Sequence, residues 1–234
     1  MPVYPPDTAE WLDAPTGLRL RRAEQVAAAD ALRRVFGAQL LQVGLWGAPD
    51  EYLPHAGTAR KALCARRQAP GVSFVAEDWQ LPVGSHSVDA VLLPHTLERS
   101  RDPHQLLREI ERVLTGGGRL IVLGFNPWSF VGLRRLLGRG AWPPGIDQTY
   151  SERRLQDWLS LLNFDVTDRG RYFPVFADDE GRLRHRASGV PGYYGAYILV
   201  AVKRVHVVTP LRALWRRTAV LGGRVVEPST RSRL

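Results

Sequence analysis

Short apolar runs alternate with helical stripes of apolar residues along most of the chain. Seven runs have the length of β-strands: 39–43, 62–65, 72–76, 88–93, 120–125, 164–166 and 197–202. Three segments repeat apolar residues three and four positions apart, as amphipathic helices do: from 17 to about Phe36, 103–114 and 151–162. Strands that alternate with helices favour a mostly parallel sheet. The last two strands follow one another without a helix, which predicts an antiparallel hairpin at the C-terminal side.

The helix expected over 103–114 carries the clearest end signals. Asp102 is a natural N-cap, Pro103 suits the first helical position, and Gly116–Gly118 would end the helix. The first residues are rich in proline, so we expect them to be irregular. The chain is therefore expected to consist of an irregular segment (1–16), one α/β domain (17–203) and a C-terminal tail (204–234).

Composition narrows the class of protein. The chain has 234 residues, of which 44% are hydrophobic, enough for one large core. No apolar run reaches the roughly 18 residues of a membrane-spanning helix, and the N-terminus does not resemble a secretory signal. Cys64 is the only cysteine, so a disulfide framework is excluded, and no His/Cys/Asp/Glu spacing suggests a metal site. We therefore expect a cytoplasmic protein without a metal.

Positive charge is concentrated at the C-terminal end. The formal net charge is +9, and the segment from Lys203 onward holds eight cations against one anion, Glu227, which gives that segment +7 and the rest +2. Such a tail can bind nucleic acid or an anionic membrane surface. The alternative is a solubilising end whose arginines reflect genome composition.

An ordered series of motifs resembles a known family. Four motifs follow one another in the family's order: Asp78–Pro82, Ser87–Leu93, Asp102–Pro103 and Leu107–Val122. The series looks like the type 11 family of class I S-adenosylmethionine-dependent methyltransferases. The similarity is strongest over 72–127 and extends over 18–203, and Gly124–Ser129 and Asp157–Phe164 resemble a little-characterised bacterial branch of that family. The resemblance implies a Rossmann-like, doubly wound α/β fold with a mostly parallel seven-stranded sheet.

The resemblance also implies where S-adenosylmethionine would bind. In open α/β sheets, ligands bind beyond the carboxyl ends of the strands. The cofactor candidates lie at such ends: Gln42, Gly44, Trp46, Gly47, Asp78, Trp79 and Pro94. In this family Asp78 would accept a hydrogen bond from the adenine amino group, and Trp79 would lie beside the ring. Capping of a turn by Asp78 and ordinary packing of Trp79 are the alternatives.

The loop after the first strand departs from the family pattern. The family shows an acid and then three glycines at alternate positions, but here Gln42 replaces the acid and only Gly44 stays in register. Trp46 stands at the second glycine position and should obstruct the cofactor unless Gly47 makes the turn instead. The segment 62–66 also lacks the acid that would hold the ribose hydroxyls. Both changes are expected to weaken cofactor binding rather than the fold.

Few residues are candidates for binding or deprotonating the methyl acceptor. His95 follows the fourth strand and is the best candidate for a general base, because the ordinary pKa of histidine lies near neutrality. Its alternative is a structural histidine bonded to the backbone. Asn126 and Trp128 follow the next strand and could hold a substrate, or could simply form a turn.

The sequence thus predicts a methyltransferase that uses S-adenosylmethionine on an unidentified substrate. The alternative is a non-catalytic methyltransferase-like binding protein with a nucleic acid or protein partner. Trp46, the missing ribose acid and the basic tail motivate that alternative. A nicotinamide enzyme would need Gly-x-Gly-x-x-Gly followed by an acid, and the chain lacks both.

Overall fold

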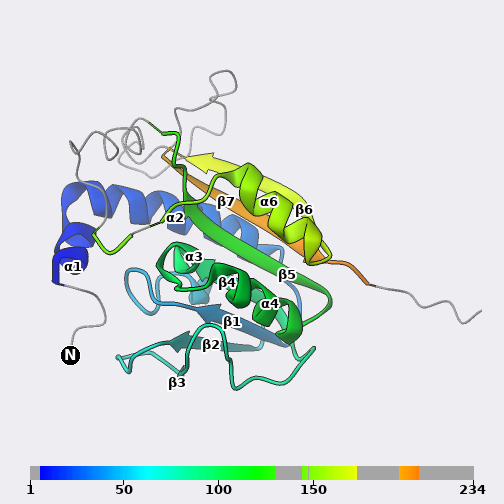
Figure 1. The fold of residues 1–234 in the computed structure, drawn as a ribbon. Coiled ribbons are helices and arrows are strands. Elements are labelled where there is room, and N and C mark those ends of the chain that lie inside the picture. The colour runs from blue at the N-terminus through cyan, green and yellow to red at the C-terminus, as the bar shows by residue number, and fades with distance from the viewer. Residues whose placement is uncertain (1–5, 130–143, 147, 173–194, 206–234) are drawn as a thin grey trace, which may run out of the picture.

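One seven-stranded sheet organises the part of the chain that the computed structural model describes, residues 6–129, 144–146, 148–172 and 195–205. The strand order is β3-β2-β1-β4-β5-β7-β6 (Figure 1). The strands are β1 (Gln39–Val43), β2 (Arg60–Ala65), β3 (Phe74–Val75), β4 (Val88–Pro94), β5 (Leu114–Phe125), β6 (Phe164–Tyr172) and β7 (Ala196–Lys203). The first five run parallel, and β7 pairs antiparallel with both β5 and β6. The predicted sheet and its C-terminal antiparallel hairpin are confirmed.

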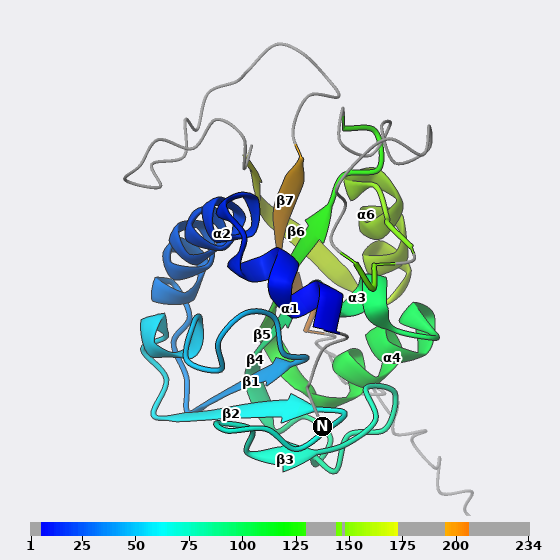
Figure 2. The same cartoon turned by 90° about the vertical axis from the view of Figure 1, so that its left-hand side faces the viewer.

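Helices cover the two faces of the sheet. Figure 2 shows α2 on one side of the strands and α4 with α6 on the other. The helices are α1 (Pro6–Asp13), α2 (Pro15–Arg33), α3 (Thr96–Arg99), α4 (Pro103–Val113) and α6 (Glu152–Leu161). One core lies under α2 and a second under α4 and α6, and alternate residues of the central strands face them. Strand alternation therefore decides which side chains of β1 and β4 meet α2.

Helix α4 begins as the sequence predicts, but it ends earlier than predicted. The Asp102 carboxylate accepts a hydrogen bond of 2.9 Å from the Gln105 N–H, and Pro103 opens the helix. The helix stops at Val113, before the glycines, because β5 already begins at Leu114. Gly116–Gly118 lie within β5, where the pairing with β4 shifts register. The expectation that these glycines terminate the helix is wrong: they form an irregularity in the strand.

The N-terminal segment is also more ordered than its composition predicts. Helix α1 occupies Pro6–Asp13, inside the segment expected to be irregular. Leu12 is buried in the core, and the Thr8 hydroxyl donates a hydrogen bond of 2.7 Å to the Pro144 carbonyl. Tertiary packing rather than local propensity therefore stabilises this helix.

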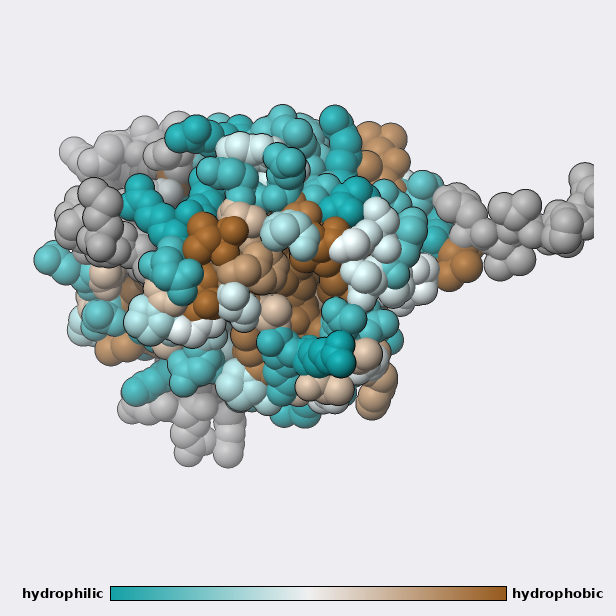
Figure 3. Space-filling view, turned by 90° about the horizontal axis from the view of Figure 1, so that it is seen from below, coloured by the Kyte–Doolittle hydropathy of each residue, from teal (hydrophilic) through white to brown (hydrophobic). Residues whose placement is uncertain are grey.

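Helices are missing between the first four strands. The connection 44–59 between β1 and β2 holds only the short 3₁₀ helix η1 (Leu53–His55), and 66–73 and 76–87 hold no helix. Apolar side chains gather in the middle of the face seen from below, where β3 forms the sheet edge (Figure 3), and Val75 of β3 is 46% exposed. Among the described residues, helices alternate with the strands only from β4 to β6.

Among the described residues, no helix is long and apolar enough to cross a membrane. The basic tail lies outside the described residues from position 206 onward. Arg204, the first residue of the tail, is described and packs against the domain. Its backbone N–H donates to the Asn163 carbonyl at 2.8 Å, and its guanidinium forms an ion pair with Asp165.

Candidate functional site

The parallel strands bring the candidate residues to one edge of the sheet. Strands β1 and β4 are neighbours, so the loop after Val43 lies beside the loop after Pro94. Strand β2 lies on the other side of β1 and leads into Arg66. Asp78 follows the outermost strand, and Asn126 directly follows β5. The predicted site residues therefore share the carboxyl edge, as expected for this fold.

The turn after β1 is built by two glycines. Gly44 has φ 89° and Gly47 has φ 72°, values that side chains other than hydrogen rarely tolerate. A Cβ on Gly47 would overlap the Glu51 carboxylate, which accepts a hydrogen bond of 2.8 Å from the Ala48 N–H. Gly47 thus makes a tight turn, which is the possibility raised from the sequence for a loop with Trp46 at the second glycine position. A Cβ on Gly44 would overlap the Thr96 hydroxyl, so packing within the chain already demands this glycine.

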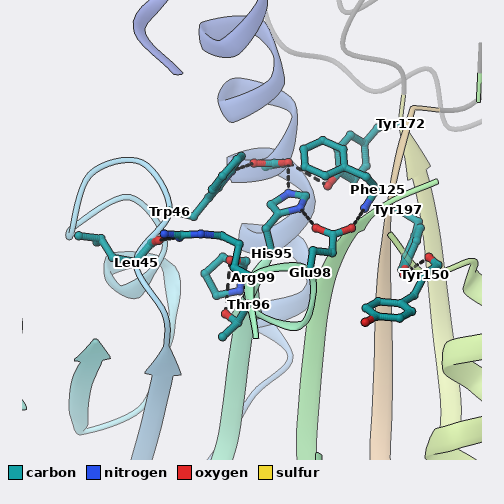
Figure 4. A network of polar contacts seen from close by, with 12 residues as sticks. Leu45, Trp46, His95, Thr96, Glu98, Arg99, Phe125, Tyr150, Tyr172 and Tyr197 are labelled. Carbon is teal, nitrogen blue, oxygen red and sulfur yellow. Dashed lines mark hydrogen bonds and ion pairs between the residues drawn. The ribbon is translucent and has the colours of Figure 1, made fainter. Parts of the chain in front are cut away.

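Trp46 points into the protein and is completely buried. Its indole N–H donates a hydrogen bond of 2.9 Å to Glu24 Oε2, and its ring centroid lies 4.6 Å from that of His95 (Figure 4). The ring of Phe125, at the end of β5, lies 6.1 Å away, edge-on. Arg99 fixes the same loop by donating to the Leu45 carbonyl at 2.8 Å. The indole therefore fills space at the carboxyl ends of β4 and β5.

His95 lies between two buried carboxylates. Its Nε2 is 2.7 Å from Glu24 Oε1, and its Nδ1 is 2.6 Å from Glu98 Oε2. The second oxygen of Glu98 accepts the Phe125 backbone N–H at 2.6 Å, and the Phe125 ring stacks on the imidazole at 4.0 Å. Figure 4 shows this chain of contacts linking α2, β4, α3 and β5. The network ties four elements together at the edge where the sequence predicts the reaction.

These contacts decide the protonation of His95. Burial by itself lowers the pKa of His95, but the Glu24 and Glu98 carboxylates outweigh burial and raise this pKa to about 9. Burial also raises the pKa of Glu98, against the opposing charge of His95. As an imidazolium, His95 donates from both nitrogens and keeps no lone pair for a substrate proton. The arrangement favours the structural alternative for His95, with carboxylates rather than the backbone as partners.

Glu24 is the centre of the network. Beyond Trp46 and His95, it accepts the Tyr52 hydroxyl at 3.2 Å on Oε2 and the Tyr172 hydroxyl at 3.3 Å on Oε1. Burial and the Glu24 charge hold the pKa of both hydroxyls well above its usual value, so both remain donors. The sequence interpretation missed this carboxylate. Its signal is an acid inside the alanine-rich stripe of α2 that faces the core.

Asp78 is 4% exposed and faces an arginine. Nη2 of Arg66, the first residue after β2, donates to both Asp78 oxygens at 2.8 Å. The same guanidinium lies 5.8 Å from the centroid of the Trp79 ring. The two residues expected at the adenine are therefore both in contact with Arg66, which the sequence interpretation did not consider.

Gln42 supplies a buried acceptor at the same edge. Its amide nitrogen donates to the Gly44 carbonyl at 3.1 Å, while Oε1 has no hydrogen-bond partner among the described residues. Buried polar atoms are nearly always satisfied, so this oxygen is suited to a donor from a ligand or water.

Asn126 and Trp128 form a turn. The Asn126 side-chain oxygen accepts the Trp128 N–H at 3.1 Å, and the Asn126 carbonyl accepts the Ser129 N–H at 3.2 Å. The Trp128 residue is 78% exposed. Of these two candidates, only Trp128 offers a large surface to a substrate.

In the described part of the chain, no group of three His, Cys, Asp or Glu side chains could hold a metal ion.

Comparison with known proteins identifies the family. Residues 27–122 match the profile of the type 11 methyltransferase domain. The protein YafS of Escherichia coli K12, described as uncharacterized, is 37% identical over 203 residues, which are 86% of this chain and 82% of YafS. The chain belongs to the type 11 methyltransferase family. Membership and the structural neighbours imply S-adenosylmethionine as its cofactor.

Solved structures confirm the fold. An S-adenosylmethionine-dependent methyltransferase of Thermotoga maritima matches with a TM-score of 0.59 and 17% identity, over 79% of this chain and 91% of that one. The [4+2]-cyclase SpnF matches with a TM-score of 0.56 and 21% identity, over 79% of this chain and 81% of that one. Because similarity at this level includes a cyclase, it establishes the architecture and not the reaction.

The described arrangement does not fit an adenosyl group. Both Asp78 oxygens are bonded to Arg66, no acid follows β2, and the Trp46 indole fills the end of β4. The Gln42 oxygen is a buried acceptor at this edge without a hydrogen-bond partner among the described residues. Cofactor binding here would require these side chains to move.

Proposed function

We propose that this chain is an S-adenosylmethionine-dependent methyltransferase whose cofactor edge must rearrange to admit the adenosyl group. The supporting observation is the buried carboxylate of Asp78 at the carboxyl edge, in the position that the family resemblance assigns to adenine. The Gly44–Gly47 turn retains two glycines at positive φ on the same edge.

A local movement of the loop after β1 would carry the indole out of this edge. Gly44 and Gly47 flank Leu45 and Trp46, so rotations at the glycines would carry the indole away from His95. This movement would leave Glu24 without one of its four donors. Because that loss costs free energy, we expect weaker cofactor affinity than in relatives with the complete glycine motif.

Roles at the acceptor side follow from the same geometry. His95 is proposed as a positioning residue that holds the end of β4 against α2 and α3. Trp128 and Asn126 are the proposed substrate contacts, with the exposed indole supplying the larger surface. A methyl acceptor would then approach between the ends of β4 and β5.

Titration calorimetry with S-adenosylhomocysteine tests the proposal. We expect measurable binding that Asp78→Ala abolishes. Asp102→Asn is a suitable control, because an asparagine still caps α4 and the site is untouched. Transfer of a labelled methyl group from S-adenosylmethionine to size-separated fractions of a cell extract then assigns the acceptor class.

Failure of both S-adenosylmethionine and S-adenosylhomocysteine to bind would remove the enzymatic proposal. The non-catalytic binding protein would then be the better hypothesis.

A further inference from the structure

Arg66 reverses the charge expected after β2. The family resemblance implies an acid for the ribose hydroxyls in this stretch, whereas this chain ends β2 at Ala65 and continues with an arginine. The Arg66 side chain is 35% exposed, while that of Asp78 is only 5% exposed. A flexible cation is therefore placed over a fixed, buried anion.

Arg66 is held at this place by several groups. Nη2 bonds both Asp78 oxygens at 2.8 Å, and Nε lies 3.6 Å from Glu77 Oε2. Nη1 donates to the Arg99 carbonyl at 3.4 Å, and the guanidinium lies 5.8 Å from the Trp79 ring centroid. Arg66 thus occupies the Asp78 carboxylate and lies near the Trp79 ring, the two groups that an adenine would contact.

A guanidinium and an adenine amino group compete for the same carboxylate. Both donate N–H groups, but the guanidinium is charged, and charge-assisted hydrogen bonds are the stronger ones. The adenine must therefore displace Arg66 before Asp78 can accept its amino group. Partial exposure limits the strength of the ion pair, so displacement remains within reach of a ligand.

We infer that Arg66 is an internal competitor that lowers the affinity of this chain for adenosyl ligands by occupying Asp78. The inference rests on the proposed function, because it assumes that adenosyl ligands bind at this edge. It assigns to Arg66 control over cofactor affinity, with Asp78 as the group through which Arg66 acts.

The test compares binding of S-adenosylhomocysteine by the full-length chain and its variants in calorimetry. Arg66→Ala and Arg66→Met both remove the donors, and methionine also keeps much of the stem that covers Asp78. Both variants should bind about threefold to tenfold more tightly than the unmodified chain. Arg67→Ala, at the exposed neighbouring position, should leave the affinity unchanged.

Two further comparisons show whether the effect passes through Asp78. In an Asp78→Asn background, Arg66→Ala should give no gain, because the ion pair is already lost. Arg66→Ala should also tighten binding of adenosine but not of inosine, which presents an oxygen instead of the amino group. A gain that persists with Asp78→Asn, or that extends equally to inosine, would contradict the competition.

The remaining outcomes separate the two proposals. Equal or weaker binding by both Arg66 variants, with the unmodified chain binding normally, overturns the inference and leaves the proposed function intact. Absence of binding by every form, including the unmodified chain, overturns both. Thermal melting of each variant identifies any loss of folding, and the methionine variant is the one expected to keep the melting temperature closest to the unmodified chain.

Discussion

At the scale of single residues, Glu24 is the residue that connects the predicted site residues Trp46 and His95 to the rest of the buried network. Its carboxylate accepts hydrogen bonds from Trp46 and Tyr52 in the loop after β1 and from His95 and Tyr172, which lie much later in the sequence. Removing one partner from a buried ion pair is costly, because the groups left behind lose both water and their acceptor.

We expect Glu24→Ala to reduce the free energy of unfolding by about 3–5 kcal/mol. Urea denaturation measures the change. Glu10→Ala, on the exposed side of α1, is the matched control and should stay within about 0.5 kcal/mol of the unmodified chain. Similar values for the two variants would mean that the network contributes little to stability.

His95 makes stability depend on pH in a predictable direction. Its pKa rises from 6.5 to about 9 on folding, so its contribution is complete below pH 6.5 and is lost as pH rises through about 9. Burial also raises the pKa of Glu98. Burial and the Glu24 charge hold the pKa of Tyr52 and Tyr172 well above its usual value, so both tyrosines stay protonated over this range.

The melting temperature should therefore fall progressively between pH 6.5 and about 9. His95→Gln should lower the melting temperature and flatten this part of the profile, because glutamine carries no titrating proton. An unchanged pH profile in His95→Gln would show that another group is responsible.

Only part of this site could be predicted from the sequence. Strand ends place Gly44, Asp78 and Pro94 at one edge, because the fold dictates that edge. The partners of Trp46 and Asp78 could not be inferred, since Glu24 and Arg66 belong to other elements that only the packed fold brings against them. The acid within the alanine-rich stripe of α2 indicates a buried carboxylate, but its partners become known only from the packing of α2 against the sheet.

At the scale of elements, the turn after β1 distinguishes a structural glycine from a cofactor glycine. Gly44 has φ 89°, and a Cβ there would overlap the Thr96 hydroxyl, which itself donates to the Val43 carbonyl at 2.5 Å. The glycine is therefore required by the contact between the ends of β1 and β4, independently of any ligand.

We expect Gly44→Ala to destabilise the chain by about 2–4 kcal/mol without any ligand present. Gly84→Ala is the matched control, because a Cβ at Gly84 would lie at an ordinary 3.6 Å from Ser87 Oγ. Calorimetric melting checks both. If Gly44→Ala melted like the control, the role of this glycine would lie in ligand binding alone.

Elements with strong local signals were predictable and the others were not. The cap at Asp102 and the buried stripe of α4 act over a few residues, so the sequence locates its start. Helix α1 depends on contacts with residues such as Pro144. Gly116–Gly118 of β5 lie in an irregularity between Leu114 and Arg119, the residues that pair with β4 on either side of it. Such outcomes follow from tertiary context, which a local pattern does not contain.

At the scale of the whole molecule, charge is distributed unevenly. Beyond position 205 the sequence holds six arginines and one acid, Glu227. A flexible or ordered segment of this charge would attract nucleic acid, and such binding weakens with salt as counterions are released. Replacement of the six arginines by glutamine in the full-length chain removes this positive charge and changes no residue of the sheet.

We expect the unmodified chain to bind a single-stranded RNA oligonucleotide with an affinity that falls steeply with salt. The logarithmic slope should be about 0.7 per neutralised phosphate. The glutamine variant should lose both the affinity and the slope, whereas replacement of the same arginines by lysine should keep them, because the interaction depends on charge rather than on guanidinium geometry. Fluorescence anisotropy across a salt series measures all three forms. Equal, salt-independent binding by the three forms would show that the charge serves solubility, and the partner of this chain would then have to be sought at the carboxyl edge of the sheet.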